Sequence, residues 1–311
     1  MQIRYGYRIE VTCNVPTPFI AMLDVHPQQR GHILAPDTMT VTNLTDGSPV
    51  GGISQYEDQF GNICKRFVAP AGWSRIEAEG VIRDSGLHDA QKPGARALPP
   101  QELPDDVLVY LLGSRYCETD RLAGFAWSMF GGITDGWQKV QAVCDHVHQR
   151  IHFNYGLARN TRTAAEAFEE GVGVCRDFAH LAVTLCRCLN IPARYCTGYL
   201  GDIGVPLDPN PMDFSAWFEA YLDGQWWTFD ARHNTPRIGR VVMARGRDAT
   251  DVAILNSFGA HQLARFEVIT EEVVPSLAAR KAQLQQEFSS QQHSQSSFEH
   301  AGPVPAERRY G

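Results

Sequence analysis

A β-hairpin is the pattern that most constrains how this chain can fold. Residues 215–222 (SAWFEAYL) alternate between two faces, as a half-buried strand does. The pair Asp223-Gly224 follows, which is a signal for a two-residue type I′ turn, and residues 225–230 then form a second strand-like run. The sequence therefore predicts an antiparallel hairpin.

The short turn also fixes the register of this hairpin. It places Leu222 opposite Gln225, and the same register places Asp230 opposite Trp217. Ser215 and Asp230 are then diagonal neighbours on one face of the sheet, roughly 7 Å apart, within reach of a long side chain.

A helix is predicted to follow the glycine-rich run at residues 171–174 (GVGV). Its apolar residues have the spacing of a half-buried helix: Phe178, Leu181, Ala182, Leu185 and Leu189. Cys175 lies at the start of this helix, where the helix dipole and the neighbouring Arg176 favour a thiolate. We therefore expect a lowered pKa for Cys175 and a nucleophilic role, with a buried structural cysteine as the alternative.

A thiol hydrolase needs a base between its nucleophile and an orienting carboxylate. A histidine at position 215 could bind Asp230 with one ring nitrogen and offer the other to Cys175. The chain has Ser215 there, and a hydroxyl is no general base near neutral pH, although it could hold a water or orient a peptide.

Residues 163–234 closely resemble the transglutaminase-like superfamily. The similarity lies in TAAEAFEEGVGVCRDFAHL, in NIPARYCTGYL, and in AWFEAYL followed by WWTFDARHN. It is greatest to the bacterial transglutaminase-like cysteine peptidases, which carry an N-terminal β region. The resemblance implies a papain-like core with Cys175 as nucleophile and Asp230 as orienter, and it predicts histidine where Ser215 stands.

Two other histidines lie near these residues. In a regular hairpin His233 pairs opposite Phe214 and projects from the other face, unless a bulge near Asp230 moves it across. His180 comes five residues after Cys175, about 140° around the helix, so the two side chains do not share a face. Both histidines are interpreted as satisfied core or supporting residues.

Composition limits the partners. The net charge is 28 − 35 = −7 without a basic block, which argues against nucleic acid or an anionic membrane as the main partner. The eight cysteines form no CxxC pair, and the chain opens on a strand-like pattern rather than an apolar secretory segment. We expect a reduced, cytoplasmic protein, and the sequence does not indicate its oligomeric state.

No cofactor or metal is predicted. His148 and His152 share a helix face at i, i+4, but no third ligand follows at a convincing spacing. A solvated or capping role is the preferred interpretation of these histidines.

Four segments are predicted in the chain. Residues 1–84 show short alternating runs typical of a β domain, and residues 85–106 are rich in Gly and Pro, as in a linker that packs little. Residues 107–272 contain the core, and residues 273–311 form a polar helix and disordered tail. The fold class is α+β: a papain-like transglutaminase core, with helices at 120–130 and 135–151 packed on an antiparallel sheet, preceded by a β-sandwich-like N-terminal domain.

The function predicted from these residues is a thiol amidase or peptidase acting on peptide or isopeptide bonds. Its candidate site residues are Cys175, Asp230 and Ser215. Because Ser215 replaces the expected histidine, weak or altered activity is expected. The alternative is a non-catalytic peptide-binding or scaffold protein with the same fold, so in both cases the partner is a peptide or protein.

Overall fold

The computed structural model describes residues 1–35, 37–209 and 212–274, in which Met1–Glu272 form one unit. The predicted polar helix and tail fall almost wholly outside these residues. No helix of the described part is long and apolar enough to cross a membrane.

The hairpin belongs to a four-stranded antiparallel sheet in the order β12-β11-β10-β13. Its strands are β10 (Ala193–Tyr199), β11 (Ser215–Leu222), β12 (Gln225–Phe229) and β13 (Val241–Gly246). Leu222 lies opposite Gln225, as predicted. Asp223 and Gly224 have φ angles of 50° and 82°, which is the geometry that a type I′ turn requires.

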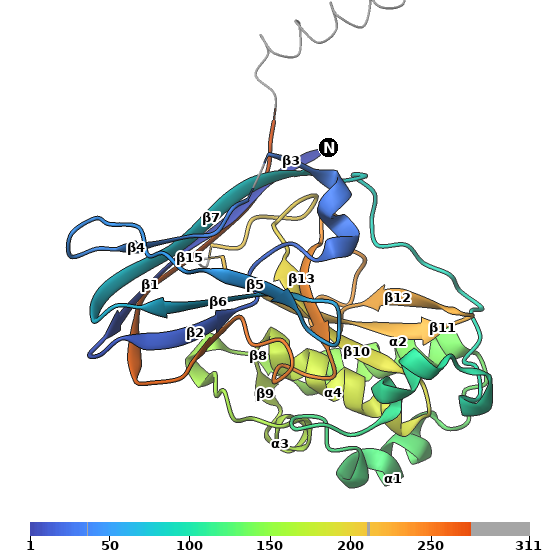
Figure 1. Cartoon of the computed structure of the whole chain (residues 1–311). Coiled ribbons are helices and arrows are strands. Elements are labelled where there is room, and N and C mark those ends of the chain that lie inside the picture. Colours follow the sequence, from blue (N-terminus) through green and yellow to red (C-terminus); the bar gives the residue numbers. More distant parts are fainter. Residues whose placement is uncertain (36, 210–211, 275–311) are drawn as a thin grey trace, which may run out of the picture. The chain divides into compact units, whose positions relative to one another are not determined.

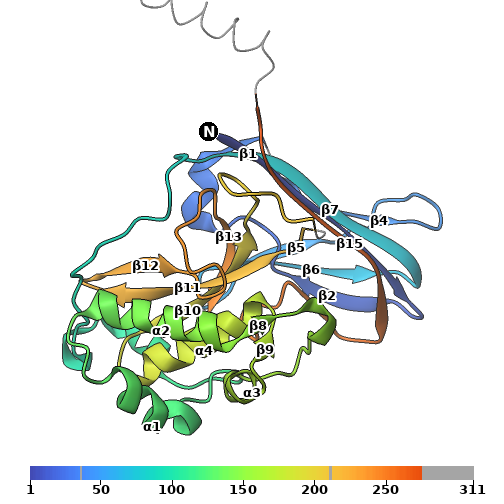
Figure 2. The same cartoon turned by 180° about the vertical axis from the view of Figure 1, so that it is seen from behind.

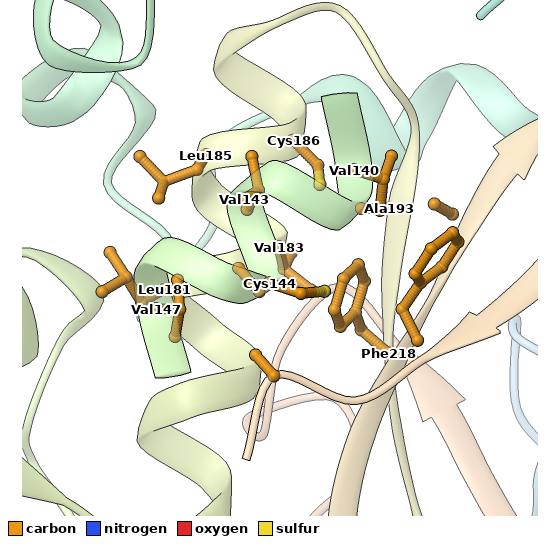
Figure 3. Close-up of a cluster of buried hydrophobic side chains, with 14 of the residues drawn as sticks. Val140, Val143, Cys144, Val147, Leu181, Val183, Leu185, Cys186, Ala193 and Phe218 are labelled. Atoms are coloured by element: carbon orange, nitrogen blue, oxygen red, sulfur yellow. The ribbon is translucent and has the colours of Figure 1, made fainter. Parts of the chain in front are cut away.

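Helices cover one side of this sheet (Figure 1). They are α1 (Thr119–Phe130), α2 (Gly136–Arg150), α3 (Ala164–Glu170) and α4 (Cys175–Cys188). The two helices predicted at 120–130 and 135–151 are confirmed as α1 and α2. Figure 3 shows part of this core, in which Val147 of α2 lies beside Leu181 of α4; Val140, Val143 and Phe218 of β11 belong to the same cluster. The helix predicted after Cys175 as half-buried is buried on all sides in the structure, because every residue of α4 except Arg176 is buried.

Two further antiparallel sheets share a second core. One has the order β15-β1-β7-β3, with β4 also on β7, and the other has the order β14-β2-β6-β5. Their bounds are β1 (Gln2–Cys13), β2 (Thr17–Ala21), β3 (Ile33–Ala35), β4 (Thr40–Asn43), β5 (Ser54–Glu57), β6 (Ile63–Ala69), β7 (Gly72–Arg83), β14 (Leu255–Ser257) and β15 (His261–Glu272). Tyr5 of β1, Phe67 of β6 and Tyr199 of β10 all belong to this core. It therefore continues into the sheet that carries the hairpin.

The last two strands complete the N-terminal sheets (Figure 2). β15 pairs antiparallel with β1 along its whole length, from Ile3 opposite Glu272 to Cys13 opposite His261, and β14 pairs with β2. Residues from both ends of Met1–Glu272 thus form one pair of sheets.

Short elements fill the connections: η1 (Pro27–His32), η2 (Pro100–Glu102), η3 (Asp105–Leu111), η4 (Tyr155–Leu157) and the parallel pair β8 (His152–Phe153) and β9 (Val172–Gly173). The Gly- and Pro-rich segment at 85–106 makes specific contacts with the core. The Arg240 Nε–H is shared between the two carboxylate oxygens of Asp89, and Ala95 is fully buried. A buried guanidinium needs a carboxylate partner, and this segment supplies one.

Candidate functional site

The start of α4 is held in place by a buried carboxylate. Asp177 Oδ2 accepts the Val174 N–H at 2.9 Å and pairs with Arg162 Nη1 at 3.1 Å. Gly173 passes so close that an added Cβ would lie 2.6 Å from the Asp177 Cβ. Only glycine lets the chain approach in this way, so the GVGV run fixes the position of Cys175.

Cys175 lies on the wall of a cleft of about 710 Å³. The loop before β11, β11 itself, the residues around β14 and the start of β15 form the other walls. The apolar residues Val252, Ile254, Leu263 and Phe266 line the cleft, as do the polar Arg115 and Asn160. The cysteine side chain is 9 % exposed, and its Sγ lies 4.0 Å from the carbonyl oxygen of Phe214.

The expected lowering of the Cys175 pKa is wrong. Burial raises the pKa of this thiol to about 11, although Arg232 and the main-chain N–H groups near the sulfur offset part of the effect. Arg176 contributes little because its guanidinium binds Asp177 and the carbonyl oxygen of Arg159. The sequence showed a neighbouring cation but not the direction of its side chain.

The hairpin ends at Phe229, one residue before Asp230. The chain then turns back, with the Asn234 N–H bonded to the Asp230 carbonyl oxygen at 2.8 Å. Asp230 Oδ1 accepts the N–H groups of Arg232 and His233, both at 3.0 Å. An aspartate that bonds main-chain N–H groups two and three residues later favours a turn over a continued strand.

This turn brings His233 onto Asp230. His233 Nδ1 lies 2.9 Å from Asp230 Oδ2. The prediction that His233 projects from the opposite face is therefore wrong, because it assumed that the ladder continued past Phe229. The structure has a complete turn at Asp230 in place of the bulge that was considered as an alternative.

Helix α2 anchors the same turn. His148 Nδ1 lies 2.9 Å from the Arg232 carbonyl oxygen. Asn234 donates to Asp145 at 2.8 Å and accepts from Gln141 at 2.9 Å. His148 thus has a local structural role, in line with its interpretation as a capping residue.

Asp230 is an ionised, fully engaged carboxylate. Arg240 Nη2 lies 2.9 Å from its Oδ2, beside the His233 contact. Burial alone would raise the Asp230 pKa, but the charge of Arg240 and the bonds from His233 hold it well below its ordinary range. Both carboxylate oxygens already accept two hydrogen bonds each.

Ser215 begins β11 opposite Gly198 of β10. It lines the Cys175 cleft and also a second cavity, of about 90 Å³, that His233 lines. Its side chain is 5 % exposed, and its Oγ has no hydrogen-bond partner among the described residues. The structure thus brings Cys175 and Ser215 to one cleft, whereas the Asp230 carboxylate is engaged by His233 and Arg240.

His180 is a buried structural residue, as predicted. Its Nε2 accepts the Ala249 N–H at 3.1 Å, and its ring stacks on Tyr116. Burial lowers the His180 pKa to about 3, so the ring is neutral. Within the described ranges no group of three or more His, Cys, Asp or Glu side chains is arranged to hold a metal ion.

Two charged residues near the thiol were missed by the sequence analysis. Asp213 lines both cavities, and burial raises its pKa. Arg232 acts electrostatically on Cys175 and stacks on Phe153 at 3.9 Å. Neither residue has a signal in the sequence beyond its position, since Asp213 precedes the predicted hairpin and Arg232 follows it.

Comparisons with known proteins identify the family and the fold. Residues 123–231 match a sequence family described as the transglutaminase-like superfamily. The structure of a candidate cysteine protease from Cytophaga hutchinsonii is 30 % identical, with a TM-score of 0.74, and the match covers 89 % of this chain and 92 % of that one. An uncharacterised protein of Mycobacterium leprae is 34 % identical over 122 residues, 37 % of this chain and 42 % of that protein, so the match spans less than half the length of that relative.

The predicted α+β fold class is confirmed by these matches, with helices packed on an antiparallel sheet and further antiparallel sheets beside it. The sequence similarity extends over nearly the whole of the solved relative. The chain belongs to the transglutaminase-like superfamily.

Proposed function

We propose that this protein is a thiol amidase or peptidase that acts on peptide or isopeptide bonds, with weak or altered activity. The observation that carries the proposal is the position of Cys175, at the first turn of α4 and on the wall of a 710 Å³ cleft. A thiol at a helix start, facing a groove large enough for several residues of a peptide, is the arrangement that acyl transfer to sulfur needs.

The cleft suits a peptide with apolar side chains. Leu263 and Phe266 lie on one wall, and Val252 and Ile254 belong to the same lining. Main-chain N–H groups near Cys175 can stabilise the oxyanion that forms when sulfur attacks a carbonyl carbon. The ligand class is thus a peptide or protein segment.

Ser215 is the reason to expect low turnover. A hydroxyl cannot accept the thiol proton as imidazole does, and loss of a general base lowers rates by about 10²–10⁴-fold. The raised pKa makes this loss more severe. With a pKa of about 11, only about 1 in 10⁴ Cys175 side chains is a thiolate at pH 7.

That same pKa favours a second candidate function. A non-catalytic peptide-binding protein could retain the cleft and use Cys175 only as a small buried residue. The two functions differ in whether the protein shows turnover that depends on Cys175, because peptide binding is expected in both.

A library of peptides and γ-glutamyl amides would test the proposal. The parent should release amine, and Cys175→Ser should abolish the release while leaving peptide affinity within about twofold, because the substitution changes one atom. Cys188→Ser is the matched control. Its Sγ lies 3.4 Å from the carbonyl oxygen of Thr119, and a hydroxyl can make the same bond. Peptide binding without Cys175-dependent release would establish the binding protein instead.

A further inference from the structure

The bond to Asp230 determines the proton positions of His233. The ionised carboxylate can only accept, so His233 Nδ1 carries the hydrogen across the 2.9 Å contact. The lone pair of the neutral ring is then on Nε2. A carboxylate that holds imidazole in this tautomer is the arrangement that orients a general base.

Ser215 and Asp213 both line the His233 cavity and the Cys175 cleft, and Ser215 is the uncharged one of the two. Its Oγ is buried and bonds to no described protein group, so the hydroxyl is free to turn to either side. The His233 cavity, at about 90 Å³, has room for a few water molecules beside that hydroxyl. A buried hydroxyl without a partner loses solvation unless a ligand or water bonds to it.

We propose that His233, oriented by Asp230, is the general base for Cys175 and acts through a relay that includes the Ser215 hydroxyl. The inference rests on the proposed thiol chemistry and names the residues that carry its proton. In this relay the Ser215 hydroxyl passes the proton from Cys175 to His233.

The proton balance of the relay is complete. The Cys175 Sγ–H proton moves to Ser215 Oγ or to water bound there, as the hydroxyl proton moves to His233 Nε2. The sulfur lone pair forms a bond to the carbonyl carbon as the C=O π pair moves onto oxygen, and the imidazolium remains paired with Asp230. The oxyanion then re-forms the C=O bond, the C–N bond breaks, and the amine leaves with the proton from His233. Water hydrolyses the thioester by the same route.

Asp213 is the competing base, because it lines both cavities. Its negative charge raises the Cys175 pKa, and once it has accepted the thiol proton it is a neutral acid that does not stabilise the thiolate. A protonated His233 would instead attract the thiolate. The electrostatics therefore favour the histidine.

The titratable and charged groups that contact His233 or line its cavity come from several segments. They are Asp230 and Arg232 on its own turn, Asp202, Asp208 and Asp213 between β10 and β11, Tyr155 of η4, and Arg237 after the turn. Acidic and basic groups are both present, so the pH profile requires comparison with a variant that lacks only the imidazole.

His233→Asn is that variant. Its amide can donate to Asp230 from nearly the place of Nδ1, but it has no Nε2. We expect kcat/KM to fall by about tenfold or more and the acidic limb of its pH profile to disappear, with unfolding unchanged. Ser215→Ala should also lower kcat/KM, by about tenfold, and exposed His32→Ala is the control.

The effect of His233→Ala on activity, measured in the parent and in Ser215→His, distinguishes a proton relay from a purely structural role of His233. In Ser215→His the new imidazole must compete with His233 for Asp230. His233→Ala should therefore lower activity in the parent but raise it, by about threefold or more, in the Ser215→His background. A structural residue would lower it in both.

Each remaining outcome has a defined meaning. Full Cys175-dependent activity in His233→Asn, or loss in Asp213→Asn alone, overturns the relay but leaves the proposed function intact. Unchanged activity in Ser215→Ala removes the hydroxyl from the relay and overturns that assignment. Absence of any Cys175-dependent release in the parent overturns both the relay and the proposed function.

Discussion

Arg240→Met removes the cation that keeps Asp230 ionised. In the structure Arg240 Nη2 lies 2.9 Å from Asp230, its Nε binds Asp89, and its guanidinium packs 4.9 Å from the Trp217 ring centroid. Methionine can keep the apolar contact with Trp217 but leaves the carboxylates of Asp230 and Asp89 without the Arg240 cation. The variant therefore isolates the contribution of the Arg240 charge to the stability of the protein.

The expected loss in the free energy of unfolding at pH 7 is about 3–5 kcal/mol, because a buried carboxylate loses its compensating charge. Adding Asp230→Asn should recover part of this loss, since the uncompensated charge at that position disappears. Arg4→Met is a matched control. Its pair with Glu79 is exposed, so a loss below about 1 kcal/mol is expected.

The dependence on pH has a definite sign. In the parent the folded-state pKa of Asp230 is lowered, so its stabilisation is present above the unfolded value and is lost as pH falls through the folded value. Without Arg240 the folded-state pKa rises, and ionisation then opposes folding. The deficit of Arg240→Met should be largest at pH 7 and shrink toward the pH range in which aspartates normally titrate.

Urea denaturation followed by tryptophan fluorescence at pH 7 and 4.5 measures the loss in the free energy of unfolding and its change with pH. A deficit below about 1 kcal/mol at pH 7 would mean that Asp230 is solvated or paired elsewhere. A deficit of equal size at both pH values would refute the assignment of the low pKa to Arg240.

Three further predictions concern the cysteine, its glycine approach and the last strand. Limiting iodoacetamide should alkylate Cys175 about 10²-fold more slowly at pH 7 than a thiol of ordinary pKa, with a rate that rises with pH toward 11; fast labelling by mass spectrometry would contradict the raised pKa. Gly173→Ala should cost about 1–3 kcal/mol in thermal unfolding and weaken Cys175-dependent release, because the new Cβ meets Asp177 at 2.6 Å; an unchanged melting temperature would show that the carboxylate can move freely. A chain that stops at Ala260 should aggregate, because β1 keeps β7 on one edge but loses β15 from the other along its whole length; a soluble, cooperatively folding product would show that β15 is dispensable.

The hairpin was predictable because local chemistry determines it. Asp223-Gly224 accepts positive φ angles at both positions, and the two-residue loop then sets every pair up to Phe218 opposite Phe229. The helices α1 and α2 were predictable for a similar reason, since their apolar stripes are the faces they bury. A two-residue turn and a helical apolar stripe both depend on residues that are close together in the sequence.

The end of the hairpin was not found, although its signal was present. Asp230 could bond N–H groups two and three residues later, and it competes in this way with the strand ladder. The deciding contacts come from α2, where Asp145 and His148 bind the turn from a distant part of the sequence. The Cys175 pKa was missed for a related reason: the dipole and Arg176 are visible in sequence, whereas burial depends on the whole fold.

The pairing of β1 with β15 has a consequence for how the polypeptide reaches its native state. During synthesis β1 leaves the ribosome early, while the strand that covers its edge is made only after the helices and the hairpin. Contacts between segments so distant in sequence form slowly, because the intervening chain must first be ordered. Until β15 arrives, β1 presents unpaired main-chain groups to any other nascent chain. Chaperone demand and misassembly should therefore depend on how quickly the ribosome completes the last strand.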